Sequence, residues 1–273
     1  MTVKTNKELA YLLELFVAND WGERFAELID EHVELPKDGL ALYVGAGTGS
    51  HAMALQERAS NKLIFHCVDE NEESLEIARA KADVLKDGAQ FLKEKVEQLG
   101  AKANQFNLVI GDASLIHSER VPQMLAEMTR VARAGATVAL ALPTFSSFGE
   151  FFSIYWEALY NCGLMSHETD VESLISSLPS ISIIEETAEE AGLENISSWT
   201  RIEEFDYESG EQFLNSPLIS DFLMPLWLQD LPAESHEQVA AEIARLINEE
   251  RHEAEFALSV KATLVTGKKP LIQ

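Results

Sequence analysis

The stretch that most constrains this chain is residues 40–50, Leu-Ala-Leu-Tyr-Val-Gly-Ala-Gly-Thr-Gly-Ser, in which an apolar run ends in three alternating glycines. The apolar half, residues 40–44, predicts a buried strand. Because glycine lacks Cβ, Gly45, Gly47 and Gly49 allow positive φ angles and let a ligand approach the main chain. A helix is expected to follow, with its first amides pointing at that ligand. The stretch therefore predicts a nucleotide-type cofactor site at the end of a parallel strand.

The glycine spacing by itself leaves the cofactor open. From Gly47, the pattern Gly47-x-Gly49-x-x-Ala52 fits a dinucleotide-binding turn. From Gly45, the pattern is the Gly-x-Gly-x-Gly of proteins that bind methyl donors. A tight turn from strand to helix without any ligand is a third interpretation.

An acidic residue follows the next apolar run at the distance that a ribose-binding site requires. Residues 63–68 predict a second buried strand, which ends in Asp69-Glu70 about 20 residues beyond the glycines. Asp69 at this point can accept hydrogen bonds from both ribose hydroxyls, although an acid at the start of a helix is also common. Asn71 is expected to cap the following helix, whose apolar face would carry Leu75, Ala78, Ala82 and Leu85.

Strand and helix patterns continue to alternate along the chain. Further strands are expected at 89–93, 106–110 and 137–142, although residues 91–99 could equally continue a helix, and a helix should open at Pro122 and end at Ala134-Gly135. Such alternation predicts an α/β fold with a Rossmann-like parallel sheet and helices on both faces. Two closing strands, residues 196–207 and 256–266, extend the expectation to seven strands, mostly parallel, with one antiparallel edge strand.

The expected domain organisation has a short lead-in and one large domain. Residues 1–39 predict two amphipathic lead-in helices, the second of them capped by Asn19-Asp20, and residues 40–273 form the main domain. Helical cap segments are expected at about 145–178 and 209–252. Their aromatic residues could form a lid over an apolar acceptor pocket, or could simply pack the inserted helices onto the sheet. These residues are Phe145, Phe148, Phe151, Phe152, Tyr155, Trp156, Phe222, Met224 and Trp227.

The composition argues against several classes of partner. With 21 Lys and Arg against 46 Asp and Glu, the formal net charge is −25, which repels nucleic acids and anionic membranes. The sequence shows neither an apolar run of about 18 residues nor a signal-like amino terminus, so we expect a cytoplasmic protein without a membrane span. Cys67 and Cys162 have no metal-binding or disulfide spacing and are expected to be buried thiols. The sequence does not indicate an oligomeric state.

The order of these features resembles the class I S-adenosylmethionine-dependent methyltransferases, most closely the small-molecule branch that includes quinone-biosynthesis C-methyltransferases. The resemblance covers roughly residues 40–270 and rests on Leu-Tyr-Val-Gly-Ala-Gly-Thr-Gly at 42–49, Val68-Asp69, Phe-Asn-Leu-Val-Ile at 106–110 and Met-Thr-Arg-Val-Ala-Arg-Ala-Gly at 128–135. The motifs Ala-Gly-Leu and Leu-Val-Thr-Gly, ending at Leu193 and Gly267, add to it. It implies S-adenosylmethionine as cofactor and a small, apolar or aromatic acceptor.

The resemblance also implies a set of cofactor-binding residues, and the chain departs from the family pattern at three positions. Tyr43 stands where the family usually has an acid that helps to hold the methionine end of the donor, and Asn107 replaces the usual aspartate of the fourth strand. Lys95 stands where an acid usually meets the adenine amino group, a contact that Glu94 could make if the register shifts by one residue. The implied cofactor site comprises Tyr43, Gly45, Ala46, Gly47, Gly49, Asp69, Glu70, Glu94, Lys95 and Asp112.

A catalytic base, if the acceptor needs one, is expected in the loop after the fourth strand. Asp112 and His117 lie there, and histidine is suited to this role because imidazole ordinarily titrates near neutrality. A structural role at a junction between loop and helix is the alternative for His117, and His51 and His66 are weaker candidates. Two other functions remain open at this stage: a non-catalytic binding or scaffold subunit with a methyltransferase fold, and a nicotinamide-dependent enzyme.

Overall fold

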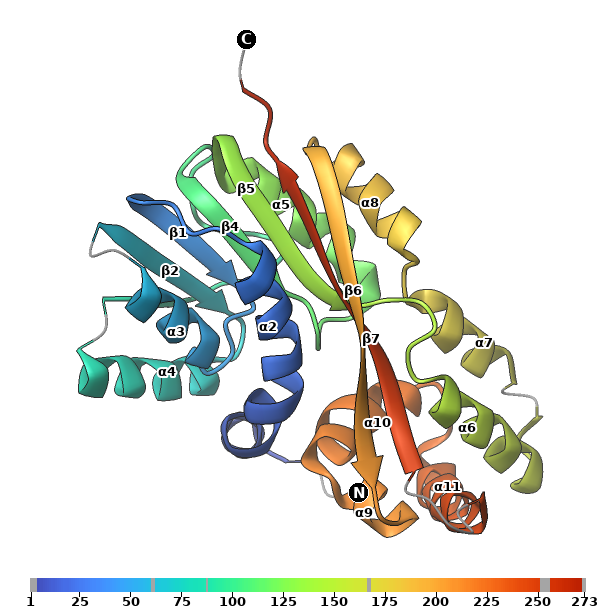
Figure 1. Ribbon diagram of the computed structural model, residues 1–273. Coiled ribbons are helices and arrows are strands. Elements are labelled where there is room, and N and C mark those ends of the chain that lie inside the picture. The colour runs from blue at the N-terminus through green and yellow to red at the C-terminus, as the bar shows by residue number, and fades with distance from the viewer. Residues whose placement is uncertain (1–3, 60–61, 87, 166–167, 251–255, 272–273) are drawn as a thin grey trace. The chain divides into compact units, whose positions relative to one another are not determined.

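The protein contains a seven-stranded sheet with the strand order β3-β2-β1-β4-β5-β7-β6 (Figure 1). The computed structural model describes residues 4–59, 62–86, 88–165, 168–250 and 256–271. In chain order the strands are β1 Gly39–Val44, β2 Leu63–Asp69, β3 Gln90–Lys93, β4 Phe106–Asp112, β5 Ala132–Pro143, β6 Glu194–Tyr207 and β7 Phe256–Lys268. The pairs β1–β2, β1–β4, β2–β3 and β4–β5 are parallel, and β7 runs opposite to its neighbours (Figure 1).

This architecture confirms the fold class expected from the sequence, a Rossmann-like and mostly parallel seven-stranded sheet. The antiparallel strand β7 lies between β5 and the outermost strand β6. In a parallel sheet the carboxyl ends of the strands share one edge, so the segments that follow β1, β2 and β4 come together there. That edge is where the glycine turn and the acids identified in the sequence lie.

The chain divides into two compact units by its internal contacts. The first, called here the sheet unit, comprises Thr5–Leu142, Ser180–Thr200 and Ala262–Gln273. The second, called the helical unit, comprises Met1–Lys4, Pro143–Pro179 and Arg201–Lys261. Strands β6 and β7 each contribute residues to both units. All the residues that the sequence assigned to the cofactor site belong to the sheet unit.

The helices of the sheet unit depart from the sequence-based expectation at several ends. They are α1 Asn6–Leu12, η1 Leu13–Gly22, α2 Glu23–His32, α3 Ser50–Arg58, α4 Glu72–Leu85, the short 3₁₀ turn η2 Ser118–Arg120, α5 Val121–Val131 and α8 Ile181–Glu190. The expected cap at Asn19-Asp20 is wrong, because η1 is a π-helical segment that continues directly into α2. The asparagine side chain instead donates to the Glu14 carbonyl at 3.4 Å, within the helical segment.

Two further expectations about helix ends and faces need correction. Asn71 caps α4 as expected, with its side chain accepting from the Ser74 amide at 3.1 Å, but Leu85 is 66% exposed because it lies in the last turn of the helix. The helix that opens near Pro122 ends at Val131 and not at Ala134-Gly135. The Ala134-Gly135 pair instead lies inside β5, where Gly135 has φ +79° and its amide donates to the Lys269 carbonyl.

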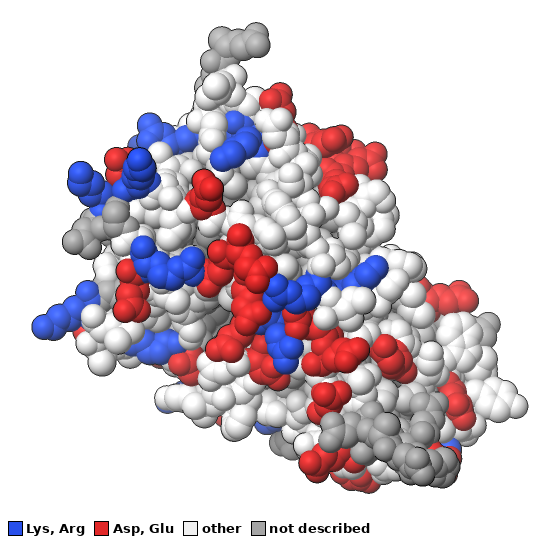
Figure 2. Space-filling model, in the orientation of Figure 1, with Lys and Arg blue, Asp and Glu red and all other residues white. Residues whose placement is uncertain are grey.

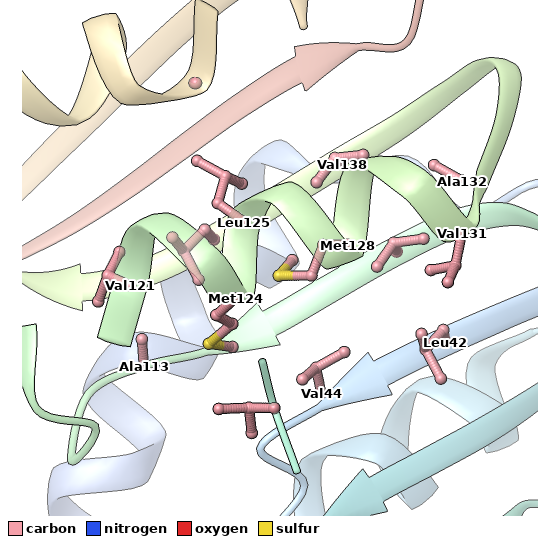
Figure 3. Close-up of a cluster of buried hydrophobic side chains, with 14 of the residues drawn as sticks. Leu42, Val44, Ala113, Val121, Met124, Leu125, Met128, Val131, Ala132 and Val138 are labelled. Atoms are coloured by element: carbon pink, nitrogen blue, oxygen red, sulfur yellow. The ribbon is translucent and has the colours of Figure 1, made fainter. Parts of the chain in front are cut away.

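One core cluster of the sheet unit forms between the sheet and α5 (Figure 3). Leu42 and Val44 of β1 pack in one cluster with Met124, Leu125 and Met128 of α5, and all five are nearly inaccessible to solvent. Because side chains alternate along a strand, Leu42 and Val44 share a face and Tyr43 points to the other one. This alternation places Tyr43 on the side of the sheet that α3 covers.

The helical unit has a core made of aromatic rings. Its helices are α6 Gly149–Asn161, α7 Glu168–Ser177, α9 Gly210–Asn215, η4 Leu218–Leu223, α10 Met224–Trp227, η5 Ala233–Ser235 and α11 His236–Glu250. Phe151 stacks on Trp227 with ring centroids 3.9 Å apart, and it also contacts Tyr155 and Phe213. Several of the aromatic residues expected either to form a lid or to pack the inserted helices thus pack against one another, and the lid stays a prediction.

Truncating a side chain on the buried face of β1 should cost far more stability than truncating the misassigned leucine of α4. Leu42 is 2% exposed, so Leu42→Ala is expected to lower the free energy of unfolding by about 2–5 kcal/mol through lost burial and a residual cavity. Leu85→Ala, at 66% exposure, should change it by less than about 0.5 kcal/mol. Urea unfolding of the two variants measures both values, and equal losses would contradict the assignment of α4's faces.

Candidate functional site

The glycine turn after β1 is held against the end of β4 by a close main-chain approach. Gly45, Gly47 and Gly49 have φ angles of +76°, +53° and +79°. A Cβ added to Gly45 would lie 2.4 Å from the Asp112 carbonyl oxygen, a distance that no side chain could occupy. By contrast, a Cβ on Gly47 would meet only Leu13 Cδ2 of η1, at 3.4 Å. A Cβ on Gly49 would lie 2.7 Å from Phe91 Cε1. Glycine is therefore favoured at all three positions by conformation, and at Gly45 and Gly49 by packing as well.

Asp69 at the end of β2 completes this turn. Its Oδ2 accepts a hydrogen bond from the Gly47 amide at 2.7 Å, and its Oδ1 accepts from the Asn71 amide at 2.9 Å. Burial raises the pKa of the Asp69 carboxyl, while the amides of Asn71 and Gly47 act in the opposite direction. The carboxylate thus links the turn after β1 with the turn after β2.

The Tyr43 hydroxyl begins a chain of hydrogen bonds that leads away from the turn. It lies 2.9 Å from His51 Nδ1 of α3, and His51 Nε2 lies 3.1 Å from Asp30 Oδ1 of α2. Arg58 makes an ion pair with the same Asp30 oxygen at 2.5 Å. Burial raises the pKa of Asp30, but its bonds to His51 and Arg58 outweigh this effect and lower it. The phenol is buried, and burial together with the charge of Asp112 keeps its pKa well above the usual value.

Asp112 lies at the end of β4, beside the glycine turn. Its Oδ1 accepts from the Ser114 amide at 2.9 Å. Burial raises the pKa of its carboxyl, and the hydrogen bonds from Ser114 act in the opposite direction. The nearby charge of Asp69 raises this pKa further. Asp112 and Asp69 are both partly buried. Among the described residues, neither acid forms an ion pair with Lys or Arg, although His51 acts on Asp112 and lowers the pKa of its carboxyl.

A second group of charges lies beside the acids, where the chain leaves β2 and approaches α5. Arg120 pairs with Glu70 Oε1 at 2.5 Å and with Glu97 Oε2 at 2.6 Å. Glu70 Oε1 also accepts from the Val96 amide at 3.3 Å. The guanidinium of Arg120 lowers the pKa of Glu97 to about 2. Glu70 is therefore engaged within the protein, although the sequence resemblance assigned it to the cofactor.

The two alternatives for the adenine contact have different surroundings. The Glu94 amide donates to the Asp69 carbonyl at 3.0 Å, and its carboxylate accepts from the Gly100 amide at 2.9 Å, which closes the local turn. Lys95 is exposed and pairs through its main chain with Gln98. The strand expected at 89–93 is confirmed as β3, and both residues follow it directly. A cofactor role for either residue stays a prediction.

His117 lies just before η2 and is about one-third exposed. Its Nδ1 lies 3.9 Å from Glu119 Oε2, and its carbonyl accepts from the Arg120 amide at 2.9 Å. No bond joins it to Asp112 within the described part of the chain. Its proposed catalytic role therefore stays a prediction, whereas His51, the weaker candidate from sequence, is the histidine that the structure joins to the site.

Sequence reasoning missed Asp30 and Arg120. Asp30 lies in α2 and reaches the site only through His51, about 20 residues further along the chain, and no local motif marks that contact. Arg120 is one of few basic residues in an acidic chain, and this scarcity is the feature of the sequence that could have drawn attention to it. Figure 2 shows how acidic side chains spread over the face it draws, with basic ones between them.

Metal sites, membrane spans and cysteines were also considered for the described residues. Nowhere in these ranges do three or more His, Cys, Asp or Glu side chains come together in a way that could hold a metal ion. No helix within the same ranges combines the length and the apolar character that a membrane span needs. Cys67 is buried as expected, whereas Cys162 is only partly buried.

Comparison with known proteins supports the methyltransferase resemblance. The family model of a methyltransferase domain matches residues 41–135, the segment that holds the glycine turn, Asp69, Asp112 and Arg120. No curated protein matches the chain by sequence. The matched segment runs from β1 to the start of β5, so the match concerns that part of the chain.

Solved structures with the same fold share little sequence with this chain. A putative methyltransferase from an antibiotic biosynthesis pathway of Anabaena variabilis aligns with a TM-score of 0.62 at 17% identity, over 90% of this chain and 97% of that one. The YcgJ protein of Bacillus subtilis aligns with a TM-score of 0.60 at 16% identity, over 91% of this chain and 99% of that one. A third structure is phosphoethanolamine N-methyltransferase 2 of Haemonchus contortus in complex with phosphomonomethylethanolamine and S-adenosylhomocysteine. It aligns with a TM-score of 0.57 at 14% identity, over 99% of this chain and 62% of that one.

Replacing the first glycine of the turn should cost stability both through backbone strain at positive φ and through a steric clash, and a second variant measures the strain alone. Gly45→Ala must adopt φ +76° and place its Cβ against the Asp112 carbonyl, whereas Gly163→Ala must adopt φ +72° in open space. Gly163→Ala is expected to cost about 1–2 kcal/mol of unfolding free energy, and Gly45→Ala clearly more. Chemical denaturation compares the two, and equal losses would show that the turn can move away from β4.

The Arg120 group should make stability depend on acid pH in a defined window. The folded pKa of Glu97, about 2, lies below its ordinary value of 4.5, so the pair stabilises the protein above about pH 4.5 and this contribution is lost as pH falls toward 2. Because the groups are partly exposed, solvent limits the effect to about 1 kcal/mol or less. Glu97→Gln should therefore lower the unfolding free energy at pH 7 and less at pH 3.

The matched control for this measurement is the exposed Glu76 of α4. Glu76→Gln should leave the unfolding free energy nearly unchanged at both pH values. An effect of Glu97→Gln that is the same at pH 7 and pH 3 would contradict the ion pair with Arg120.

Proposed function

We propose that this protein is an S-adenosylmethionine-dependent methyltransferase that acts on a small, apolar or aromatic acceptor. The observation that carries the proposal is the Asp69 carboxylate, bonded at 2.7 Å to the Gly47 amide at the carboxyl edge of the sheet, inside the segment that matches a methyltransferase domain. This arrangement combines an acid for ribose hydroxyls with a glycine turn that a ligand can approach.

The residues of the turn fit such a donor. A carboxylate offers about four acceptor positions, and Asp69 uses one on each oxygen for main-chain amides, which leaves others for two ribose hydroxyls. Gly47 keeps its surroundings open, because even an added Cβ would touch only one leucine methyl group. The first turn of α3, from Ser50, contributes amides that have no intrahelical acceptor.

The donor would supply a methyl group on a sulfonium, which is already electrophilic, so the protein mainly aligns the acceptor and excludes water. Asp112 and His117 are the proposed groups for holding a proton lost by the acceptor. Burial raises the pKa of the Asp112 carboxyl, which brings it nearer to the range in which a base works at neutral pH.

The apolar character of the acceptor is supported by a pocket within the helical unit. It has a volume of about 610 Å³. Its lining combines Phe152, Trp156, Tyr160 and Ile175 with Glu157, Gly149 and three serines. Such a lining suits a ring or hydrocarbon with one or two polar groups. A quinone-like acceptor, implied by the branch that the sequence resembles, has this chemistry.

A non-catalytic, methyltransferase-like binding subunit is the second candidate. It is favoured by the occupation of Glu70 and Glu94 in internal bonds, because these carboxylates would otherwise be available to the donor. A protein that had lost the donor could stabilise its empty site in this way. Donor binding decides between the two functions.

Isothermal titration with S-adenosylmethionine and S-adenosylhomocysteine tests the cofactor directly. We expect micromolar binding by the wild-type protein and a loss of about ten- to a hundredfold in Asp69→Asn, because a charge-assisted bond to the ribose is removed. Asp83→Asn, an exposed acid on α4, is the matched control and should bind as wild type does. No heat and no thermal shift at millimolar ligand would overturn the methyltransferase proposal.

A further inference from the structure

A polar pocket lies at the edge of the sheet opposite the glycine turn, within the sheet unit, and has a volume of about 600 Å³. Strand β7 ends beside the start of β5 at this edge (Figure 1). The Gly135 amide donates to the Lys269 carbonyl at 2.8 Å, and the Lys269 amide donates to the Ala136 carbonyl at 3.0 Å. The start of β4 and the segment before β1 complete the wall. The polar side chains of the lining are Glu34, Asn107, Arg133, Thr137 and Lys268.

The pocket brings two cations together in a strongly acidic chain. Arg133 and Lys268 both line it, although the chain has only 21 Lys and Arg against 46 Asp and Glu. No hydrogen bond or ion pair engages the Arg133 guanidinium within the ranges that the structure describes. Lys268 Nζ donates to Thr137 Oγ1 at 2.6 Å, which leaves two of its N–H groups for other acceptors. Both cations are therefore available to an anion.

Asn107 supplies a further donor to the same pocket. It stands where the resembled family usually has an aspartate. Its Oδ1 accepts from the Leu40 amide at 3.2 Å, a bond that an aspartate could accept equally well. Its Nδ2 has no acceptor among the described residues. The amide thus takes a negative charge out of the pocket and adds an N–H group, and both changes favour an anion.

The pocket is separate from the proposed cofactor site. Asn107 is the second residue of β4 and Asp112 is its last. A rise of about 3.3 Å per residue puts these two residues about 17 Å apart. A small molecule held by Asn107 is therefore too far from the glycine turn to be the methyl donor.

We propose that this pocket binds a small phosphate monoester through Arg133, Lys268 and the Asn107 amide. A phosphate monoester carries nearly two negative charges at neutral pH, which two cations match. The planar guanidinium of Arg133 can bind two phosphate oxygens at once, and Lys268 adds a point charge. The Thr137 hydroxyl, whose oxygen already accepts from Lys268, can donate its own hydrogen to another phosphate oxygen.

The acid in the lining fits the remainder of such a molecule. Glu34 forms no ion pair with Arg133 or Lys268 in the described part of the chain, so it does not neutralise either cation. A carboxylate only accepts hydrogen bonds, and it therefore suits a hydroxyl group carried by the ester. This inference goes beyond the proposed function and does not depend on it.

A titration with inorganic phosphate, followed by ¹H–¹⁵N NMR at constant ionic strength, tests the site. We expect the amide signals of Gly135 and Thr137 to shift and to saturate at millimolar phosphate. Acetate should bind at least about fivefold more weakly, because a monoanion gains less from two cations. Arg133→Gln and Lys268→Gln should each weaken phosphate binding by about two- to fivefold, and the double variant by about tenfold.

Two further variants sharpen the test. Asn107→Asp keeps an acceptor for the Leu40 amide but puts a carboxylate into the pocket, so phosphate binding should weaken by at least about tenfold. Lys7→Gln removes an exposed cation from α1 and is the matched control, which should bind phosphate as wild type does. Thermal melting shows whether each variant is folded. If Asn107→Asp is not, the exposed Arg133 and Lys268 variants decide the question.

The outcomes are distinct from those for the methyl donor. The proposal is overturned if phosphate gives no saturating shift around the pocket, if its shifts are confined to the glycine turn, or if the double variant binds it as tightly as wild type. Equal binding by folded Asn107→Asp would also contradict it. Asp69→Asn should bind phosphate as wild type does, whatever its affinity for the donor, and a loss there would contradict the separation of the two sites.

Discussion

The hydrogen bond between the Asp69 carboxylate and the Gly47 amide is the interaction on which the site depends. At 2.7 Å it joins the turn after β1 to the end of β2, and the other oxygen of the same carboxylate bonds the amide of Asn71, the residue that caps α4. One side chain therefore orients a glycine turn and the start of a helix. Because the carboxylate is partly buried, water competes less for these bonds than it would at the surface.

The close packing of Gly45 on the Asp112 carbonyl adds the third strand to this arrangement. It brings β4 so near to the turn that the side chain of Asp112 joins Asp69 and Tyr43 in one electrostatic group. The result is a pair of partly buried acids at one sheet edge, and neither forms an ion pair with Lys or Arg among the described residues. The proposed methyl donor is cationic, so its charge would be opposite to that of these acids.

The charges around Arg120 have a different character from those around Asp69. They are partly exposed and paired within the protein, since Glu70 and Glu97 share one guanidinium. This pairing connects the turn after β3 with the segment before α5, and so shapes the rim of the site. The two neighbouring acids of the sequence, Asp69 and Glu70, consequently serve different purposes, one toward the glycine turn and one toward the rim.

The sequence by itself determined the sheet, the glycine turn and Asp69, because these depend on local patterns: apolar runs that must be buried, glycines that must take positive φ, and an acid at a fixed spacing behind them. Only the tertiary structure decided that Asp30 meets His51 and that Glu70 turns to Arg120, since these pairs are 21 and 50 residues apart along the chain. The same holds for η1, whose π-helical continuation overrode the cap signal of Asn19-Asp20. A local pattern cannot report such contacts, because their energy comes from groups that only folding brings together.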